Sequence, residues 1–228
     1  MTISLSGLEA AIRNRVEIRD ATALPALINA SIAQLYRLVA NANAEWFLSP
    51  TPASVGVVAG TQSYAFGVDA FAVNGVDVLD GSTWISMPRA RWGARNAAPP
   101  TSTPSSAAYR LVGSRIFILP TPGWTQAAGL RLWYTPLPPV LTNVTPGTTD
   151  IWDTFAGWDE WVINKVALMY TSKEESDVTP WAAQLGELTR DILSQVSDRD
   201  MGEPDRIRNV RFERRYALAE DDFDAWRR

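Results

Sequence analysis

The order of patterns along this chain constrains its fold more than any single motif does. Glutamate occurs at positions 9, 17 and 45 and not again until Glu160, so a stretch of more than a hundred residues contains none. That stretch holds most of the 15 Pro and most of the alternation of β-branched and aromatic residues, which is typical of strands and turns. The flanks show the spacing of amphipathic helices instead. The sequence therefore predicts an α+β fold: a four-helix body formed by the N- and C-terminal segments, with an inserted small antiparallel β-sandwich or barrel.

Four apolar stripes define the expected helices. Their members recur at spacings of three and four residues, which places each stripe on one helix face. The stripes are Leu5, Leu8, Ile12 and Val16; Ile28, Ile32, Leu35, Val39, Ala42 and Trp46; Phe155, Trp158, Val162, Val166 and Met169; and Trp181, Leu185, Leu188, Ile192 and Val196. Pro25 and Pro180 mark the starts of the second and fourth helices, because proline is tolerated in a first turn.

Short alternating runs predict the strands of the inserted part. They cover residues 62–66, 70–73, 76–79, 83–87, 109–112, 115–119 and 130–134. Asn74-Gly75 has the composition of a two-residue hairpin turn, and Gly113-Ser114 predicts a second hairpin.

The predicted organisation has four segments. Residues 1–48 supply the N-terminal helices, 49–149 the inserted β domain, 150–201 the C-terminal helices and 202–228 an extended C-terminal arm. Gly202 suits a helix end, and Pro204 prevents the helix from resuming. The arm contains seven Arg and seven Asp or Glu, and its apolar residues stand singly among them. Because such a segment does not close a core of its own, we expect it to bind a partner.

Two missing residue types exclude whole classes of chemistry. The chain has no Cys and no His, so disulfides, thiolate metal sites and nucleophiles activated by histidine are ruled out. No phosphate-binding glycine motif occurs either. We therefore expect no enzyme, no cofactor and no metal site.

Charge and hydropathy narrow the choice of partners. The net charge of −4 argues against a dedicated nucleic-acid binder and leaves transient contact with DNA open. The basic residues are 19 Arg and only two Lys. This excess of Arg suits protein interfaces, although a GC-rich coding genome would give the same ratio. No run has the length of a membrane span and the N-terminus lacks a signal-peptide pattern, so we expect a chain that stays in the cytosol or assembles there into something larger, without a membrane partner.

Two further segments are candidates for function. The long connection between residues 88 and 108 begins with Arg89, Arg91, Trp92 and Arg95, and it is either a solvated excursion or a loop that touches a neighbouring subunit or passing DNA.

The second segment combines carboxylates with tryptophans. Asp150, Asp153, Asp159 and Glu160 stand beside Trp152, Trp158 and Trp161. This combination suits either a sugar-handling site or helix capping with core packing.

The order of elements resembles the head-to-tail adaptor (connector) proteins of tailed phages, particularly the tail tubular protein A type of short-tailed phages. The pieces that carry the resemblance are LPALINASIAQLYRLV, YRLVGSRIFILPTP followed by LRLWYTPLPPVLT, WDEWVINKVALMYTSKEESD and RDMGEPDRIRNVR. Together they extend over most of the chain.

The resemblance implies a virion structural protein at the head–tail junction, assembled in the host cytoplasm. Such adaptors form a ring, usually of twelve subunits, which binds beneath the portal protein, surrounds a DNA channel and meets the tail, nozzle or other neck proteins. In this family a C-terminal arm docks onto the portal. By position, the portal-facing residues would be Arg206, Arg208, Arg211, Phe212, Arg214, Arg215, Tyr216, Phe223 and Trp226. A carbohydrate-acting or carbohydrate-binding tail protein and a stopper or tail-completion protein are the alternative interpretations.

Overall fold

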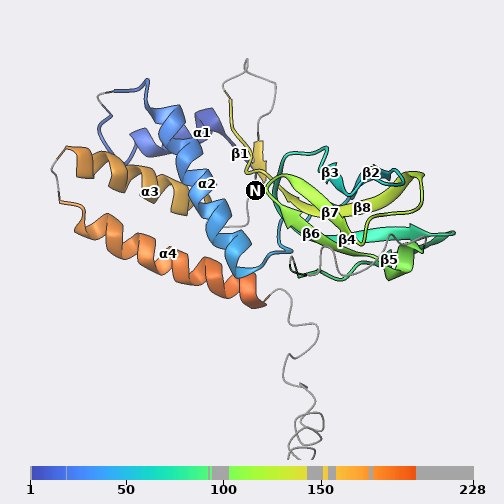
Figure 1. The fold of residues 1–228 in the computed structure, drawn as a ribbon. Helices are drawn as coiled ribbons and strands as arrows, with labels where there is room; N and C mark the ends of the chain where they lie inside the picture. The colour runs from blue at the N-terminus through green and yellow to red at the C-terminus, as the bar shows by residue number, and fades with distance from the viewer. Residues whose placement is uncertain are drawn as a thin grey trace, which may run out of the picture.

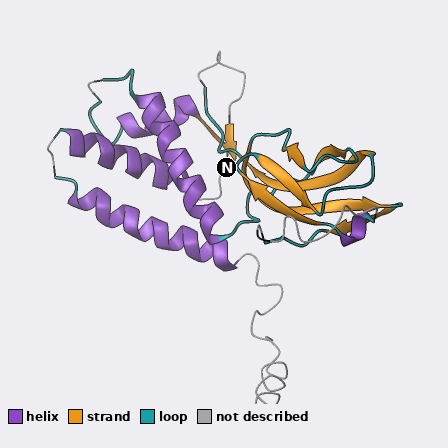
Figure 2. Cartoon of the chain, in the orientation of Figure 1, coloured by secondary structure: helices purple, strands orange, loops and turns teal. Residues whose placement is uncertain are grey.

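The computed structural model describes residues 2–18, 20–91, 93, 103–142, 151–153, 158–174 and 177–198. These residues form a helical part and a β part that lie beside each other (Figure 1). Helices and strands separate almost completely between the two parts (Figure 2). The predicted α+β class is therefore confirmed. The predicted arm, residues 202–228, lies outside the described residues, and the four-segment division of the chain stays a prediction.

The helical part combines segments from both ends of the chain. Its helices are α1 (Leu5–Arg13), α2 (Leu24–Ala42), α3 (Trp158–Lys173) and α4 (Thr179–Asp198). The Ser4 side chain accepts a hydrogen bond from the Gly7 N–H at 3.1 Å and caps α1, and Pro25 occupies the first turn of α2. Helix α3 contacts each of the other three helices, which explains why its apolar residues surround most of its circumference.

One core holds the four helices together. All four predicted stripes contribute to it, so the helical periodicity read from the sequence corresponds to real packing. Its fully buried members include Leu8, Ile12, Leu24, Ile28, Ile32, Leu35, Val39, Trp158, Val162, Val166 and Val196.

A short strand precedes α1, and another lies shortly before α3. Strand β1 (Thr2–Ser4) pairs antiparallel with β9 (Ile151–Asp153), with Ile3 opposite Trp152. The sequence did not predict these strands, because three residues are too few to show a period.

The β part consists of two antiparallel sheets. One has the strand order β2-β8-β4-β5 and the other β3-β7-β6. The strands are β2 (Ala53–Val57), β3 (Ser63–Ala65), β4 (Ala70–Asp80), β5 (Thr83–Ser86), β6 (Ala108–Val112), β7 (Arg115–Leu119) and β8 (Gln126–Pro136). Val76 and Leu132 from one sheet and Ile116 and Ile118 from the other are fully buried in a common core. Among the described strands the arrangement is a sandwich, not a closed barrel.

The predicted hairpin at Asn74-Gly75 is wrong. Strand β4 continues through both residues and pairs with β8, with a register shift between Val73 and Gly75. The Asn74 amide donates to the Ala44 carbonyl at 2.7 Å and accepts a hydrogen bond from the Thr135 hydroxyl at 3.2 Å. These tertiary contacts satisfy the side chain that would otherwise stabilise a turn. The second hairpin is confirmed, because Gly113 has a φ of +57° between β6 and β7.

Candidate protein-interaction surfaces

Only two of the predicted contact residues fall within the described part of the chain. They are Arg89 and Arg91, from the start of the connection that follows β5. The others lie outside the described residues: Trp92, Arg95, Arg206, Arg208, Arg211, Phe212, Arg214, Arg215, Tyr216, Phe223 and Trp226.

The backbone on either side of Arg89 extends the smaller sheet. Arg89 forms a parallel bridge with Tyr109 of β6. The Tyr109 N–H donates to the Pro88 carbonyl at 2.9 Å, and the Ala90 N–H donates to the Tyr109 carbonyl at 2.7 Å. The first residues of the long connection are thus held against the edge of the sheet by the same pattern that joins strands.

The Arg89 side chain connects the two sheets. Its Nε donates to the Tyr109 hydroxyl at 2.9 Å, and its Nη2 donates to the Val73 carbonyl of β4 at 3.0 Å. The guanidinium carbon lies 5.9 Å from the centre of the Tyr109 ring, within the range of a cation–π contact. Arg89 is therefore a structural brace, although part of its surface remains exposed.

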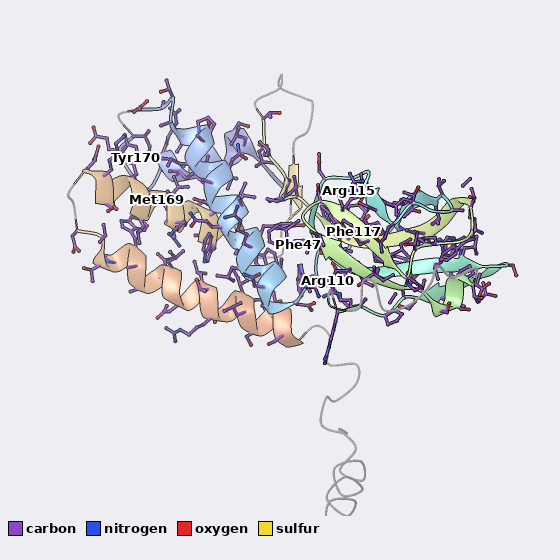
Figure 3. The ribbon with its side chains drawn as sticks, in the orientation of Figure 1. Phe47, Arg110, Arg115, Phe117, Met169 and Tyr170 are labelled. Atoms are coloured by element: carbon purple, nitrogen blue, oxygen red, sulfur yellow. The ribbon has the colours of Figure 1, made fainter. Side chains whose placement is uncertain are left out.

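A shallow pocket of about 250 Å³ opens beside this brace. It is lined by Arg89, Tyr109, Arg110 and Leu111. Arg110 extends into solvent from the β part (Figure 3). Its Nη1 makes a long contact of 3.4 Å with the Ala90 carbonyl. Arg91, two residues beyond Arg89, is also exposed. Within the described part of the chain neither Arg89 nor Arg110, the two arginines of the lining, pairs with a carboxylate, so the pocket carries an uncompensated positive charge.

An aromatic cluster joins the helical part to the β part. Tyr36 of α2 stacks on Phe47 with ring centres 4.0 Å apart and an interplanar angle of 11°, and Phe71 of β4 meets Tyr36 edge-on at 5.7 Å. Phe47 also contacts Trp158 of α3 edge-on, and Figure 3 shows it between the helices and the sheets. The Tyr36 hydroxyl donates to the Pro136 carbonyl at 2.7 Å, and burial raises the pKa of Tyr36 to about 12.

Directional hydrogen bonds fix the same junction. The Asn29 side chain of α2 donates to the Leu141 carbonyl at 2.9 Å and accepts from the Leu141 N–H at 2.8 Å. The Ala44 carbonyl accepts from Asn74 and from the Thr135 hydroxyl, the latter at 3.1 Å. Because each bond requires its own geometry, together they set the orientation of the β part relative to the helices.

An exposed apolar segment lies between two of these anchor points. Pro136 and Leu141 are both bound to α2, yet Leu137 and Val140 between them are 51% and 68% exposed. Holding large apolar side chains in water has no benefit for the isolated fold. An apolar surface held in place in this way is typical of a contact with another protein.

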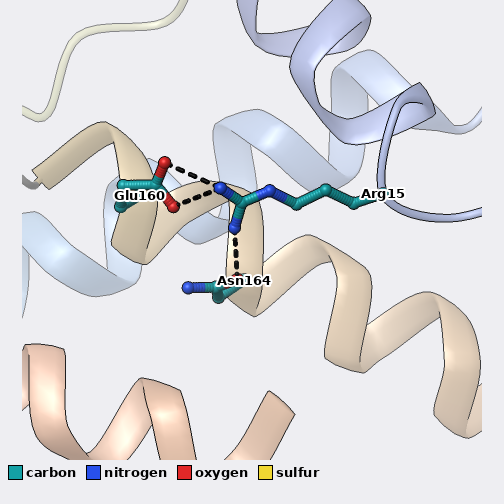
Figure 4. A network of polar contacts seen from close by, with 3 residues as sticks. All are labelled: Arg15, Glu160 and Asn164. Atoms are coloured by element: carbon teal, nitrogen blue, oxygen red, sulfur yellow. Dashed lines mark hydrogen bonds and ion pairs between the residues drawn. The ribbon is translucent and has the colours of Figure 1, made fainter. Parts of the chain in front are cut away.

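Glu160, Trp158 and Trp161 have structural roles, whereas Asp150 and the side chains of Trp152 and Asp153 lie outside the described residues. Glu160 pairs with Arg15 at 2.6 Å, and Arg15 also donates to the buried Asn164 at 2.8 Å (Figure 4). Trp158 and Trp161 are 1% and 4% exposed, and the Trp161 N–H donates to Thr189 of α4. Two buried rings offer no face on which a sugar ring would stack.

Two exposed carboxylates have turn-stabilising roles. The pKa values of Asp20 and Asp177 are lowered chiefly by hydrogen bonds from a threonine two residues further on. No group of three or more acidic side chains is placed to hold a metal ion in the described ranges. Likewise, no helix of the described chain has the length and apolarity to cross a bilayer.

The described structure defines a class of protein: a two-part structural subunit whose distinctive surfaces are a basic pocket and an exposed apolar segment. The comparison with protein families makes this specific. The family model described as "SU10 adaptor protein" matches residues 3–226. The chain belongs to this family of phage adaptor proteins, and the predicted resemblance to phage adaptors is confirmed. It is a structural component of the virion, in a family that is not an enzyme class. No curated protein matches the chain in sequence.

Proposed function

We propose that this chain is the head-to-tail adaptor that attaches beneath the portal, joins it to the tail and forms part of the DNA channel. The observation that carries the proposal is the match to an adaptor family over residues 3–226, which includes almost all of the predicted arm. The interactions expected of an adaptor are with other virion proteins. The portal on one side and tail, nozzle or other neck proteins on the other are the partners that we propose.

A ring of twelve subunits is the proposed assembly. The exposed Leu137 and Val140 supply an apolar contact for a neighbouring subunit, and the junction with α2 holds them in a fixed position. The net charge of −4 per subunit also suits a channel, because an acidic wall does not grip phosphates and lets double-stranded DNA pass.

The arm is the proposed portal-binding element. Arginine and aromatic residues dominate interface hot spots. A guanidinium group forms two parallel hydrogen bonds to one carboxylate, and large aromatic rings exclude water from the contact. The nine residues named above supply both groups within one segment. When one of twelve arms in a ring has bound a portal subunit, the others are held close to their own sites, so the ring binds much more tightly than a single arm would.

Deletion of residues 203–228 tests the arm. We expect the shortened chain to keep its thermal unfolding temperature and to lose co-sedimentation with the portal of the same phage. The matched control replaces Arg206, Arg208 and Arg211 by Lys, which keeps the charge and removes the fork geometry; intermediate binding is expected. If the shortened chain binds the portal as well as the intact chain does, the arm is not the portal-binding element.

A further inference from the structure

The pocket beside Arg89 is built to receive an anion. Arg89 is fixed by two hydrogen bonds and by the Tyr109 ring, so its positive charge is held at one wall. Arg110 lies at another wall, and Arg91 lies two residues from Arg89. Toward the residues that the structure describes, each guanidinium has more donors than it uses, and none of them faces a carboxylate there. Half-buried Leu111 adds an apolar surface to the lining.

The chemistry of the pocket favours a protein segment over nucleic acid. A DNA-binding surface gains affinity from many phosphate contacts along a basic stripe, whereas this subunit is acidic overall. A pocket that combines guanidinium forks with an apolar wall fits a short peptide in which carboxylates flank an aromatic side chain.

The chain itself contains such a peptide. Residues 220–224 read Glu-Asp-Asp-Phe-Asp, so four carboxylates surround Phe223. Five of the seven Arg of the arm lie in residues 206–215, and the other two, Arg227 and Arg228, end the chain. From Asp198, the end of α4, a chain of 24 residues spans at most about 80 Å to Asp222. A tether of this length keeps a segment at an effective concentration near the millimolar range.

We propose that the pocket formed by Arg89, Arg110 and Leu111 binds residues 220–224 of the same chain before the subunit meets its partner. The acidic end of the arm then lies on its own β part, and portal binding replaces this contact. The proposal rests on the proposed function only for the identity of the partner that releases the arm. The contact itself is a property of the free subunit.

Disulfide trapping tests the contact in the full-length chain. Because the natural sequence has no Cys, the double variant Leu111→Cys, Asp222→Cys forms only one disulfide within a chain. It keeps all three arginines. We expect most molecules to form this bond under mild oxidation at low salt and to migrate as monomers. The yield should fall about five-fold in 1 M salt, where charges are screened beyond about 3 Å.

Two matched variants separate specific docking from random collision. Moving the second cysteine to Asn209, among the arginines of the arm, should lower the yield about five-fold, because like charges repel. Arg110→Glu added to the double variant should lower it similarly, whereas Arg110→Lys should largely retain it. If Leu111→Cys lowers the thermal stability, Arg91→Cys replaces it on an exposed position.

The outcomes are distinguishable. Equal yields for the Asp222 and Asn209 positions would refute the proposal. Covalent dimers from a mixture of the two single-cysteine variants, without the monomeric product in the double variant, would assign the acidic segment to a neighbouring chain and overturn it as well. Retained portal binding by the chain that lacks residues 203–228 would refute the portal assignment, and it would leave the trapping yield in the free full-length subunit unchanged.

Discussion

Replacement of Tyr36 by Phe isolates the hydrogen bond that ties α2 to the end of β8. The variant keeps the ring that stacks on Phe47 and removes only the hydroxyl that donates to the Pro136 carbonyl at 2.7 Å. A hydrogen bond of this kind contributes about 1 kcal/mol net. We therefore expect the free energy of unfolding at pH 8 to fall by about 1 kcal/mol. For a chain of this size that lowers the melting temperature by about 2–4 °C.

The same variant has a pH dependence with a defined sign. Burial raises the pKa of Tyr36 from its ordinary value of 10.0 to about 12, so between these values the unfolded chain loses a proton that the folded chain keeps. The unfolded state then binds fewer protons, and the free energy of unfolding of the natural protein falls as the pH rises, by up to about 1.4 kcal/mol per pH unit. The Tyr36→Phe variant has no ionisable hydroxyl at this position, so its free energy of unfolding does not fall for this reason. The two stability curves should therefore converge above pH 10 and cross near pH 11, at an order-of-magnitude estimate.

Urea unfolding followed by tryptophan fluorescence, from pH 8 to 11.5, measures both effects. The other tyrosines are common to both proteins, so their titration cancels in the difference. Tyr170→Phe is the control, because it removes a hydroxyl that accepts the Asp20 N–H within the helical part, away from the junction. Parallel curves for the natural protein and Tyr36→Phe across this range would refute the burial and hydrogen bonding assigned to Tyr36.

Three further changes test other parts of the structure. Arg15→Met should cost about 1–3 kcal/mol in urea unfolding because it deprives the buried Asn164 of its donor, whereas Glu160→Gln removes only a partly exposed ion pair and should cost less than about 1 kcal/mol. Gly129→Ala should cost about 1–3 kcal/mol in thermal melts, because the added methyl would meet Val57 at 2.8 Å; a Val57→Ala background should reduce that cost, and an unchanged cost would contradict the packing. Val140→Asp should leave the melting temperature within about 2 °C and, if the proposed ring forms through this surface, lower the assembled fraction in sedimentation; unchanged assembly would exclude this surface from the proposed ring contact.

The helical part was predictable because its information is local. Stripes at spacings of three and four identified all four helices, and Pro25 and Pro180 marked two starts. The ends were less accurate. Helix α2 ends at Ala42, and Trp46 beyond it stacks on Trp158 at 5.6 Å instead of continuing the helix. The pattern showed that Trp46 is apolar and faces the core, and it did not show that the chain had already left the helix.

The strands of the β part were predictable only where a turn residue and an alternating pattern of apolar residues indicated the same hairpin. The hairpin of β6 and β7 has both, with Gly113 at its turn. Strand β2 was missed, because Ala53–Val57 contains Gly56 and no aromatic residue. Its place beside β8 explains that glycine, since a Cβ there would lie 2.9 Å from the Ala127 carbonyl oxygen. The need for glycine at this position comes from β8, about seventy residues further along the sequence, so the residues around Gly56 do not indicate it.

Arg89 is both part of the candidate pocket and part of the contact between the two sheets, so a variant at this position changes binding and stability together. In the sequence it belongs with Arg91 as the start of a basic loop, but its guanidinium is bound to the Tyr109 hydroxyl and the Val73 carbonyl of the opposite sheet. Removing it would leave the Tyr109 hydroxyl and the Val73 carbonyl without this partly buried donor and would lower stability by about 1 kcal/mol. A loss of binding by Arg89→Ala would therefore be ambiguous. Arg110 and Arg91 carry similar charge on exposed positions, so variants there change the electrostatics of the pocket while the brace between the sheets stays in place.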